Sequence, residues 1–244
     1  MRPFLSGMSP SSHADLQLDV GVLVPAAGRG ERAGAGELKQ YRPIRGVPML
    51  LRSIRPFAAH PRVRQVVVAL PPADAAGPPS WLAGLTGERL RLVPGGATRA
   101  ASVSAALNVL DPDCRIVLVH DAARPFVTRE TIDAVIRVAE TGQGAVAAVP
   151  MTDSLKRGDS TDRVVGSVDR RDVWRAQTPQ GFPRHVLEEA YRTAGNTPGN
   201  WAPTDDAELV ERAGFTVILV PDTPANIKVT TPEDLRLAEA LAAP

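Results

Sequence analysis

The sequence predicts one α/β domain with a mostly parallel, twisted sheet and a β-arm that protrudes from it. Short apolar runs rich in β-branched residues alternate with segments of helical period, as in parallel sheets that are covered by helices. This alternation breaks once, between residues 151 and 180. With 244 residues, the chain is also long enough to bury the core of such a domain.

Six apolar runs are expected to form the strands of the sheet. Pro or Gly bounds most of them, and their continuous apolar character is typical of strands that are buried on both faces. The predicted strands are Val20–Val24, Gln65–Leu70, Leu90–Val93, Ile116–His120, Ala145–Val149 and Thr216–Val220.

Six segments of helical period are expected to cover the sheet. Thr128 is placed to cap the third and Pro232 to occupy the first turn of the last, whereas Pro56 should end or kink the first. The Pro and Gly steps of Pro71–Ser80 indicate an irregular loop. The predicted helices are Met49–Ala59, Arg99–Leu110, Arg129–Thr141, Arg184–Ala194, Asp205–Arg212 and Glu233–Ala242.

The interrupting segment, Met151–Gln180, is expected to form a β-hairpin arm. Two short strands, around Ser154–Lys156 and Val164–Val168, flank the turn residues Arg157–Ser160. An isolated hairpin is only marginally stable in water, so this one should pack on a partner, most commonly a two-fold copy of the same chain. We therefore expect a homodimer.

The charge balance excludes partners that only net charge would attract. The chain has 28 Lys and Arg against 27 Asp and Glu, which argues against nucleic-acid and membrane-surface partners. Its single cysteine, Cys114, permits no internal disulfide and indicates a reducing compartment. No apolar run approaches the about 20 residues of a membrane span, and residues 1–19 lack the apolar core of a signal peptide. We expect a cytoplasmic protein with a flexible tail over residues 1–19 and one domain over residues 20–244.

The glycine-rich segment after the first strand is the first candidate site. Gly28 and Gly30 would let backbone N–H groups approach an anion. Five cations outnumber two acids between residues 29 and 45, and Arg32 and Lys39 among them suit a nucleoside triphosphate. The segment lacks the helix and distant acid of a dinucleotide-binding fold and the Gly-Lys-Ser/Thr of a P-loop. The alternative is a solvated basic loop.

Two further strand ends carry candidate ligand-binding residues. Gly95 and Gly96 would let a flat ligand lie against the backbone, and Ser102 can hydrogen-bond that ligand or its own helix. Asp121 leaves the end of a buried strand, where an open sheet places ligand-facing groups, and can bind Mg²⁺ that phosphates carry. The alternatives for Asp121 are a helix cap or an ion pair with Arg124.

The last candidate, Lys228, follows a short strand before the final helix. It is one of only three lysines, and a lysine supplies the compact point charge that arginine does not. Structural roles explain several neighbouring motifs: Asp205 is placed to cap a helix, Thr231 and Asp234 form a capping pair, and His120 suits a packed strand end.

Taken together, these segments resemble the 2-C-methyl-D-erythritol 4-phosphate cytidylyltransferases of the non-mevalonate isoprenoid pathway. The resemblance runs from about Val20 to Leu241 and rests on strings in the family's order and near its spacing. These strings are PAAGxGxR, LKQY, PGGxxRxxSV, VHDAARP, a DSLK-like string, VDR, QTPQ, TDD and NIKVTxPEDLxLAE. It implies a nucleotide-diphospho-sugar-transferase-like (Rossmann-like) domain, a homodimer that exchanges its arms, and CMP transfer from CTP with Mg²⁺, releasing pyrophosphate.

By position, the resemblance also implies a role for each candidate residue. The catalytic cations would be Arg32, Lys39 and Lys228. The nucleotide would be bound by Pro25, Ala26, Ala27, Gly28, Gly30, Gly95, Gly96, Ser102, Asp121 and Ala122, with Asp121 also at the metal. The sugar phosphate would be held by Arg124 and Thr204, and by Ser154 and Arg170 of the partner subunit.

The sequence departs from the family pattern at five positions. Leu38 replaces a usual Pro, Ala97 stands where an acid often follows the two glycines, Ser154 stands for Thr, Asp206 for Glu, and Ala225 for Asp. The alanines remove polar contacts near the base and the substrate. Two alternatives stay open: a cytidylyltransferase for another polyol phosphate, such as ribitol 5-phosphate, and a catalytically decayed nucleotide-binding regulatory protein.

Overall fold

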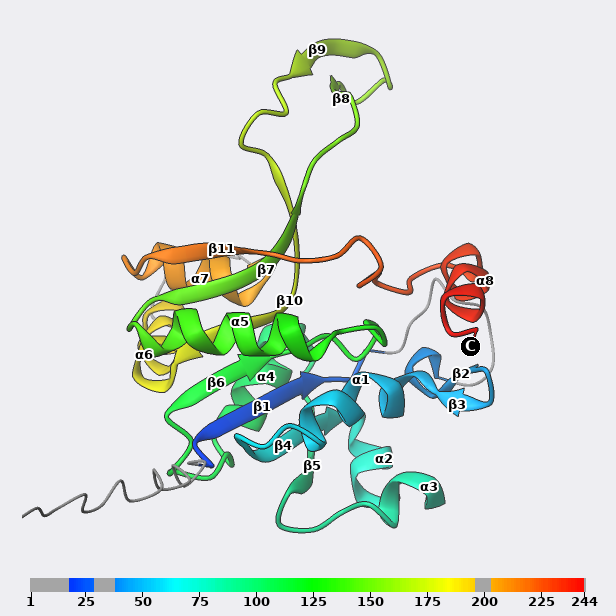
Figure 1. The fold of residues 1–244 in the computed structure, drawn as a ribbon, viewed down its shortest axis with the longest axis vertical. Helices are drawn as coiled ribbons and strands as arrows, with labels where there is room; N and C mark the ends of the chain where they lie inside the picture. The colour runs from blue at the N-terminus through cyan, green and yellow to red at the C-terminus, as the bar shows by residue number, and fades with distance from the viewer. Residues whose placement is uncertain (1–17, 29–37, 196–202, 244) are drawn as a thin grey trace, which may run out of the picture.

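The structure, a computed structural model, describes residues 18–28, 38–195 and 203–243. Its centre is a seven-stranded sheet in the order β11-β7-β10-β6-β1-β4-β5 (Figure 1). The strands are β1 (Val20–Pro25), β4 (Val63–Leu70), β5 (Leu90–Pro94), β6 (Ile116–Val119), β7 (Gly144–Pro150), β10 (Trp174–Pro183) and β11 (Val217–Pro221). All six predicted strands are present, with ends that differ by at most two residues.

The sheet is parallel except at β10, which runs antiparallel to both of its neighbours, β6 and β7. At the centre, Val22 of β1 lies beside Val66 of β4 and Leu118 of β6. Strand β10 is not among the predicted strands, because its polar sequence Gln177-Thr178-Pro179-Gln180 does not read as a buried strand. All three polar side chains of that run are nevertheless buried.

Helices cover both faces of the sheet (Figure 1). α1 (Met49–Ala58) and α5 (Arg129–Glu140) pack on one face, and α4 (Arg99–Leu107), α6 (Arg184–Gly195) and α7 (Asp206–Arg212) pack on the other. Side chains of β1 alternate between the two faces. Val22 and Val24 pack in the core beneath α1 and α5, and Leu23 packs in the core beneath α4, α6 and α7. The last helix is α8 (Pro232–Leu241).

The expected caps are confirmed and two local predictions are corrected. The Thr128 side chain caps α5, and Pro232 occupies the first turn of α8. Helix α1 continues past Pro56 to Ala58, because only its last turn loses a hydrogen bond there. The predicted loop Pro71–Ser80 contains the short helix α2 (Pro72–Ala76) and the start of α3 (Ser80–Ala83), since proline is tolerated in a first helical turn.

Residues 151–173, between β7 and β10, form an arm that projects away from the sheet (Figure 1). The predicted arm extended to Gln180, but residues 174–180 belong to β10 and pair within the central sheet. The tip of the arm is a two-stranded antiparallel sheet of β8 (Leu155–Gly158) and β9 (Val164–Val168). Val164 and Val165 of β9 are 66% and 58% exposed. The tip therefore presents apolar side chains to solvent in the isolated chain.

A small substructure packs near the carboxyl end of β1. The hairpin β2 (Pro43–Ile44) and β3 (Val47–Pro48) follows the 3-10 helix η2 (Lys39–Tyr41). Its turn uses positive φ angles at Arg45 and Gly46. Ile44 and Met49 pack against Val229 and Ala238, so the segment that carries Lys39 is joined to α8 and to the chain that precedes it.

At the other end of β1, the predicted tail meets the core. Of residues 1–19 the structure describes only Leu18 and Asp19, and Asp19 is buried against the guanidinium of Arg62. Within the described ranges, no helix is both long and apolar enough to cross a membrane.

Candidate active site

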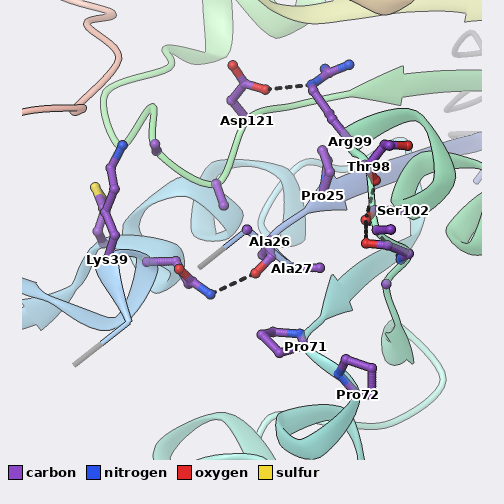
Figure 2. Close-up of a pocket in the computed structure, with 18 of the residues that line it drawn as sticks. Pro25, Ala26, Ala27, Lys39, Pro71, Pro72, Thr98, Arg99, Ser102 and Asp121 are labelled. Carbon is purple, nitrogen blue, oxygen red and sulfur yellow. Dashed lines mark hydrogen bonds and ion pairs between the residues drawn. The ribbon is translucent and has the colours of Figure 1, made fainter. Parts of the chain in front are cut away.

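A cavity of about 650 Å³ opens at the carboxyl ends of the parallel strands β1, β4, β5 and β6 (Figure 2). In an open α/β sheet, ligands bind at this edge because the loops that leave neighbouring strands converge there. The cavity is lined by Pro25, Ala26, Ala27, Gly28, Lys39, Gln40, Met49, Pro71, Pro72, Gly95, Gly96, Ala97, Thr98, Arg99, Ser102, Asp121, Ala122, Ala123 and Lys228.

Most of the predicted nucleotide-binding and catalytic residues meet in this cavity. Those that line it are Pro25, Ala26, Ala27, Gly28, Lys39, Gly95, Gly96, Ser102, Asp121, Ala122 and Lys228. Gly30 and Arg32 lie outside the described residues. Four predicted residues do not line the cavity in this chain: Arg124, Ser154, Arg170 and Thr204.

The two glycines after β5 form a wall on which no side chain fits. A Cβ at Gly95 would lie 2.4 Å from the Ala27 Cβ and 2.9 Å from the Ser102 Oγ, and one at Gly96 would lie 2.4 Å from the Ala101 Cβ. The absence of side chains thus lets the backbone at these positions pack closely against its neighbours, and both glycines also line the cavity.

Ser102 makes the expected hydrogen bond to its own helix and also contacts the glycine wall. Its hydroxyl donates to the Thr98 carbonyl at 3.0 Å and accepts from the Gly96 N–H at 3.1 Å. The side chain thus stays on its own helix, α4, and also fixes the glycine wall.

Asp121, which follows β6, is surrounded by cations. Its carboxylate lies 2.8 Å from Lys228 Nζ, 3.3 Å from Arg99 Nε and 3.7 Å from Arg124 Nε. Burial opposes ionisation, but Arg99 and Lys228, followed by Arg124, overcome it and hold the pKa of Asp121 well below its usual range. Asp121 is therefore a fixed negative charge, and the predicted ion pair with Arg124 is the weakest of the three.

Lys39 reaches the cavity from η2, on the side opposite Ser102 (Figure 2). Its neighbour Gln40 is buried and donates through Nε2 to the Ala26 carbonyl at 2.8 Å. The Tyr41 hydroxyl donates to Asp74 at 2.7 Å. These two bonds tie η2 to the end of β1 and to α2, and so help to hold the segment that carries Lys39.

Comparison with known proteins identifies the family. The family model for 2-C-methyl-D-erythritol 4-phosphate cytidylyltransferase matches residues 20–243. The chain belongs to this family. The predicted family and the predicted fold class are both confirmed.

Individual relatives cover nearly the whole chain. The 2-C-methyl-D-erythritol 4-phosphate cytidylyltransferase of Symbiobacterium thermophilum is 43% identical over 232 residues, which are 95% of this chain and 96% of the relative. That of Saccharopolyspora erythraea is 44% identical over 230 residues, covering 93% and 100% of the two chains. The crystal structure of the Thermus thermophilus cytidylyltransferase matches with a TM-score of 0.77 at 36% identity, covering 92% and 98%.

Two residues to which the family resemblance assigns substrate binding are engaged within this chain. Arg124 is buried and donates through Nη1 to the Asn226 carbonyl at 2.8 Å, which holds the segment before Lys228. Thr204 donates its N–H and its hydroxyl to the Glu208 carboxylate at 2.8 and 2.9 Å, beside the Asp205 cap of α7.

The other two residues of that group, Ser154 and Arg170, are exposed on the arm. The Arg170 guanidinium donates to the Thr152 carbonyl at the base of the arm.

His120 is confirmed as a packed strand-end histidine. Burial lowers its pKa to about 4. One ring nitrogen lies 3.0 Å from the Thr178 hydroxyl and the other 3.0 Å from the Arg124 carbonyl. The ring is therefore neutral at physiological pH and hydrogen-bonded at both nitrogens.

Arg99 is the charged cavity residue that sequence reasoning missed. It belongs to the PGGxxRxxSV string and is the first residue of α4. The sequence does not predict that its side chain points toward Asp121, as it does in the structure (Figure 2). Only the fold shows that contact, since the two residues come from different strand ends.

Proposed function

We propose that this chain transfers the CMP group of CTP to the phosphate of 2-C-methyl-D-erythritol 4-phosphate. The reaction forms 4-diphosphocytidyl-2-C-methyl-D-erythritol, releases pyrophosphate and serves isoprenoid precursor biosynthesis. One observation carries the proposal: Lys39, Lys228 and Asp121 converge with the backbone wall of Gly95 and Gly96 on one cavity.

The cavity suggests how the nucleotide lies. Cytosine would rest on the Gly95–Gly96 wall, and the ribose would lie beside Asp121 and Ala122. The triphosphate would then extend along Pro25, Ala26, Ala27 and Gly28 toward Lys39, with Gly30 and Arg32 completing its binding site.

Asp121 fits the Mg²⁺ that accompanies CTP. Among the described side chains, no three His, Cys, Asp or Glu residues gather as a metal site. Mg²⁺ needs few protein carboxylates when phosphate oxygens supply other ligands, and Asp121 offers one ionised carboxylate at the cavity. When bound, the ion would neutralise phosphate charge.

The chemistry needs no protein base. A phosphate monoester has a second pKa of about 6, so the acceptor is already ionised near neutral pH. One of its oxygens attacks the α-phosphorus of CTP, and the bond from that phosphorus to the pyrophosphate oxygen breaks. The protein supplies alignment and positive charge, which we assign to Arg32, Lys39 and Lys228.

We further propose that the active enzyme is a cytoplasmic homodimer. Ser154 and Arg170 lie on the projecting arm, and two exposed valines, Val164 and Val165, give its tip an apolar contact surface. The sugar phosphate would bind between Arg124 and Thr204 of one chain and these arm residues of the partner. The single cysteine is buried and unpaired, in keeping with a reducing compartment.

A pyrophosphate-release assay tests the proposal. Purified protein with CTP, Mg²⁺ and 2-C-methyl-D-erythritol 4-phosphate should release pyrophosphate, and replacing the acceptor with ribitol 5-phosphate should lower the rate at least about tenfold. Faster turnover of ribitol 5-phosphate would assign the enzyme to that acceptor. Release with none of a panel of polyol phosphates would reject the transfer reaction.

A further inference from the structure

Arg99 connects two carboxylates that belong to different parts of the site. Its Nε lies 3.3 Å from Asp121 Oδ1 after β6, and its Nη1 lies 2.6 Å from Asp206 Oδ2 at the start of α7. Asp206 is completely buried and Asp121 nearly so. A buried carboxylate is costly unless it is paired, and the Arg99 guanidinium contributes to that pairing at both places.

Asp206 in turn fixes the amino end of α7. Its second oxygen accepts from the Tyr191 hydroxyl at 2.6 Å, and its N–H donates to Gln180 Oε1 at 3.1 Å. Two residues earlier, Thr204 is held by Glu208 of the same helix. A displacement of Asp206 would therefore move the turn that carries Thr204.

We infer that Arg99 is a positioning residue of the transfer reaction. Its contacts with Asp121 and Asp206 set the distance between Asp121 and the turn that carries Thr204. In the proposed function, on which this inference rests, Asp121 binds the nucleotide and Thr204 the sugar phosphate. Arginine suits the task because its planar fork presents separate N–H groups to two acceptors, whereas the lysine ammonium is a single point charge.

The first test compares Arg99→Gln with a matched control, Arg62→Gln. Arg62 pairs with the buried Asp19 at the opposite end of β1, and its side chain is 22% exposed against 28% for Arg99. Both variants should lose thermal stability. Only Arg99→Gln should also lower kcat by about ten- to a hundredfold, because small misplacements of reacting groups are costly, and weaken CTP binding about five- to tenfold in calorimetry with Mg²⁺.

Two further variants test the linkage. Arg99→Lys should bind CTP at least about fivefold more weakly than wild type, since one ammonium cannot hold both carboxylates. Wild-type affinity in Arg99→Lys would show that only the positive charge at this position matters. Asp206→Asn should reproduce the loss, and the double variant Arg99→Gln/Asp206→Asn should lose little more than either single variant, because the residues act as one unit.

The outcomes separate this inference from the proposed function. CTP affinity and kcat within twofold of wild type in Arg99→Gln or Asp206→Asn, or equal losses in Arg62→Gln, would overturn the positioning role. If Arg99→Gln does not fold, Arg99→Lys and Asp206→Asn decide by the same limits. Wild-type protein that binds CTP but transfers CMP to no acceptor would reject the proposed function, while the CTP affinities of the variants still decide the role of Arg99.

Discussion

Lys228 Nζ lies 2.8 Å from Asp121 Oδ2, although more than a hundred residues separate the two in the sequence. Arg124 helps to fix this contact, because it donates to the Asn226 carbonyl two residues before Lys228. The Lys228 side chain is 45% exposed at the cavity, whereas that of Asp121 is 10% exposed. The lysine is thus held by a buried carboxylate while it lines the cavity.

Replacing either cavity lysine should impair the chemical step. We expect Lys39→Ala and Lys228→Ala each to lower kcat at least about a hundredfold, the scale for losing one preorganised charge contact in a transition state. Lys156→Ala is the control, since the third lysine lies on the arm and donates to Ser167. Near-normal kcat in either cavity variant, measured by pyrophosphate release, would remove that lysine from the mechanism.

The glycine wall should select the base. We expect CTP to be preferred over ATP, GTP and UTP, because the Gly95–Gly96 backbone and Ser102 form a close-fitting surface at one end of the cavity. Initial rates with each nucleotide at equal concentration measure this preference. Equal turnover of the purine nucleotides would contradict it.

A methyl group on the wall should disturb nucleotide binding. The Gly95→Ala Cβ would lie 2.4 Å from the Ala27 Cβ, so one of the two segments must shift. We expect kcat/KM for CTP to fall at least about tenfold, since such overpacking typically costs about 1–3 kcal/mol. The control is Gly84→Ala, where the nearest atom to the new Cβ is the Ser80 carbonyl oxygen at 3.7 Å. A similar fall in Gly84→Ala would point to a general loss of structure.

The arm arginine should act on the sugar phosphate. If Arg170 reaches the partner's substrate, Arg170→Ala should raise the KM for the acceptor about tenfold or more and leave CTP binding nearly intact. Arg171→Ala is the neighbouring control, because the Arg171 side chain is 86% exposed and pairs with Asp169. An unchanged acceptor KM in Arg170→Ala would exclude this contact.

Mixed dimers test the shared site directly. When Arg170→Ala subunits are mixed with Lys228→Ala subunits, one composite site of a heterodimer carries both lesions and the other carries neither. Partial activity should therefore return. No return after subunit exchange has been shown, or a monomer by light scattering at assay concentration, would reject the shared site.

The cap of α8 should make stability depend on pH. Hydrogen bonds from the Thr230 hydroxyl and nearby N–H groups lower the pKa of Asp234 to about 2. Because this pKa is depressed in the folded state, the contribution is complete above about pH 4 and is lost as the pH falls toward 2. Asp234→Asn should thus cost about 1 kcal/mol at pH 7 and progressively less below pH 4.

Thermal unfolding between pH 2 and pH 7 measures the effect of the cap. Glu233→Gln is the control, since Glu233 lies in the same turn but is 69% exposed and pairs with the exposed Arg236. It should change stability by less than about 0.5 kcal/mol. A pH-independent cost of Asp234→Asn would show that its charge has no part in the cap.

Local features of this fold follow from the sequence because their causes lie within a few residues. The apolar run Val20–Val24 becomes β1, and Thr128 and Thr231 cap helices through N–H groups only three residues away. Gly95 and Gly96 can be predicted as site residues for the same reason. They connect a strand to the helix that follows it, and such loops lie at the carboxyl ends of the strands, where ligands bind.

Contacts between distant segments decided the rest. Strand β10 cannot be predicted from the sequence, because the hydrogen-bond partners of its buried polar side chains lie in distant segments. Gln180 accepts from an N–H of α7, and Thr178 accepts from the N–H of Asp121 after β6. The same holds for Arg99, whose partners Asp121 and Asp206 are brought together by the order of the strands. A polar residue in a sequence looks solvent-exposed until its partner is known, and pairing of buried charges depends on distances that only the folded chain sets.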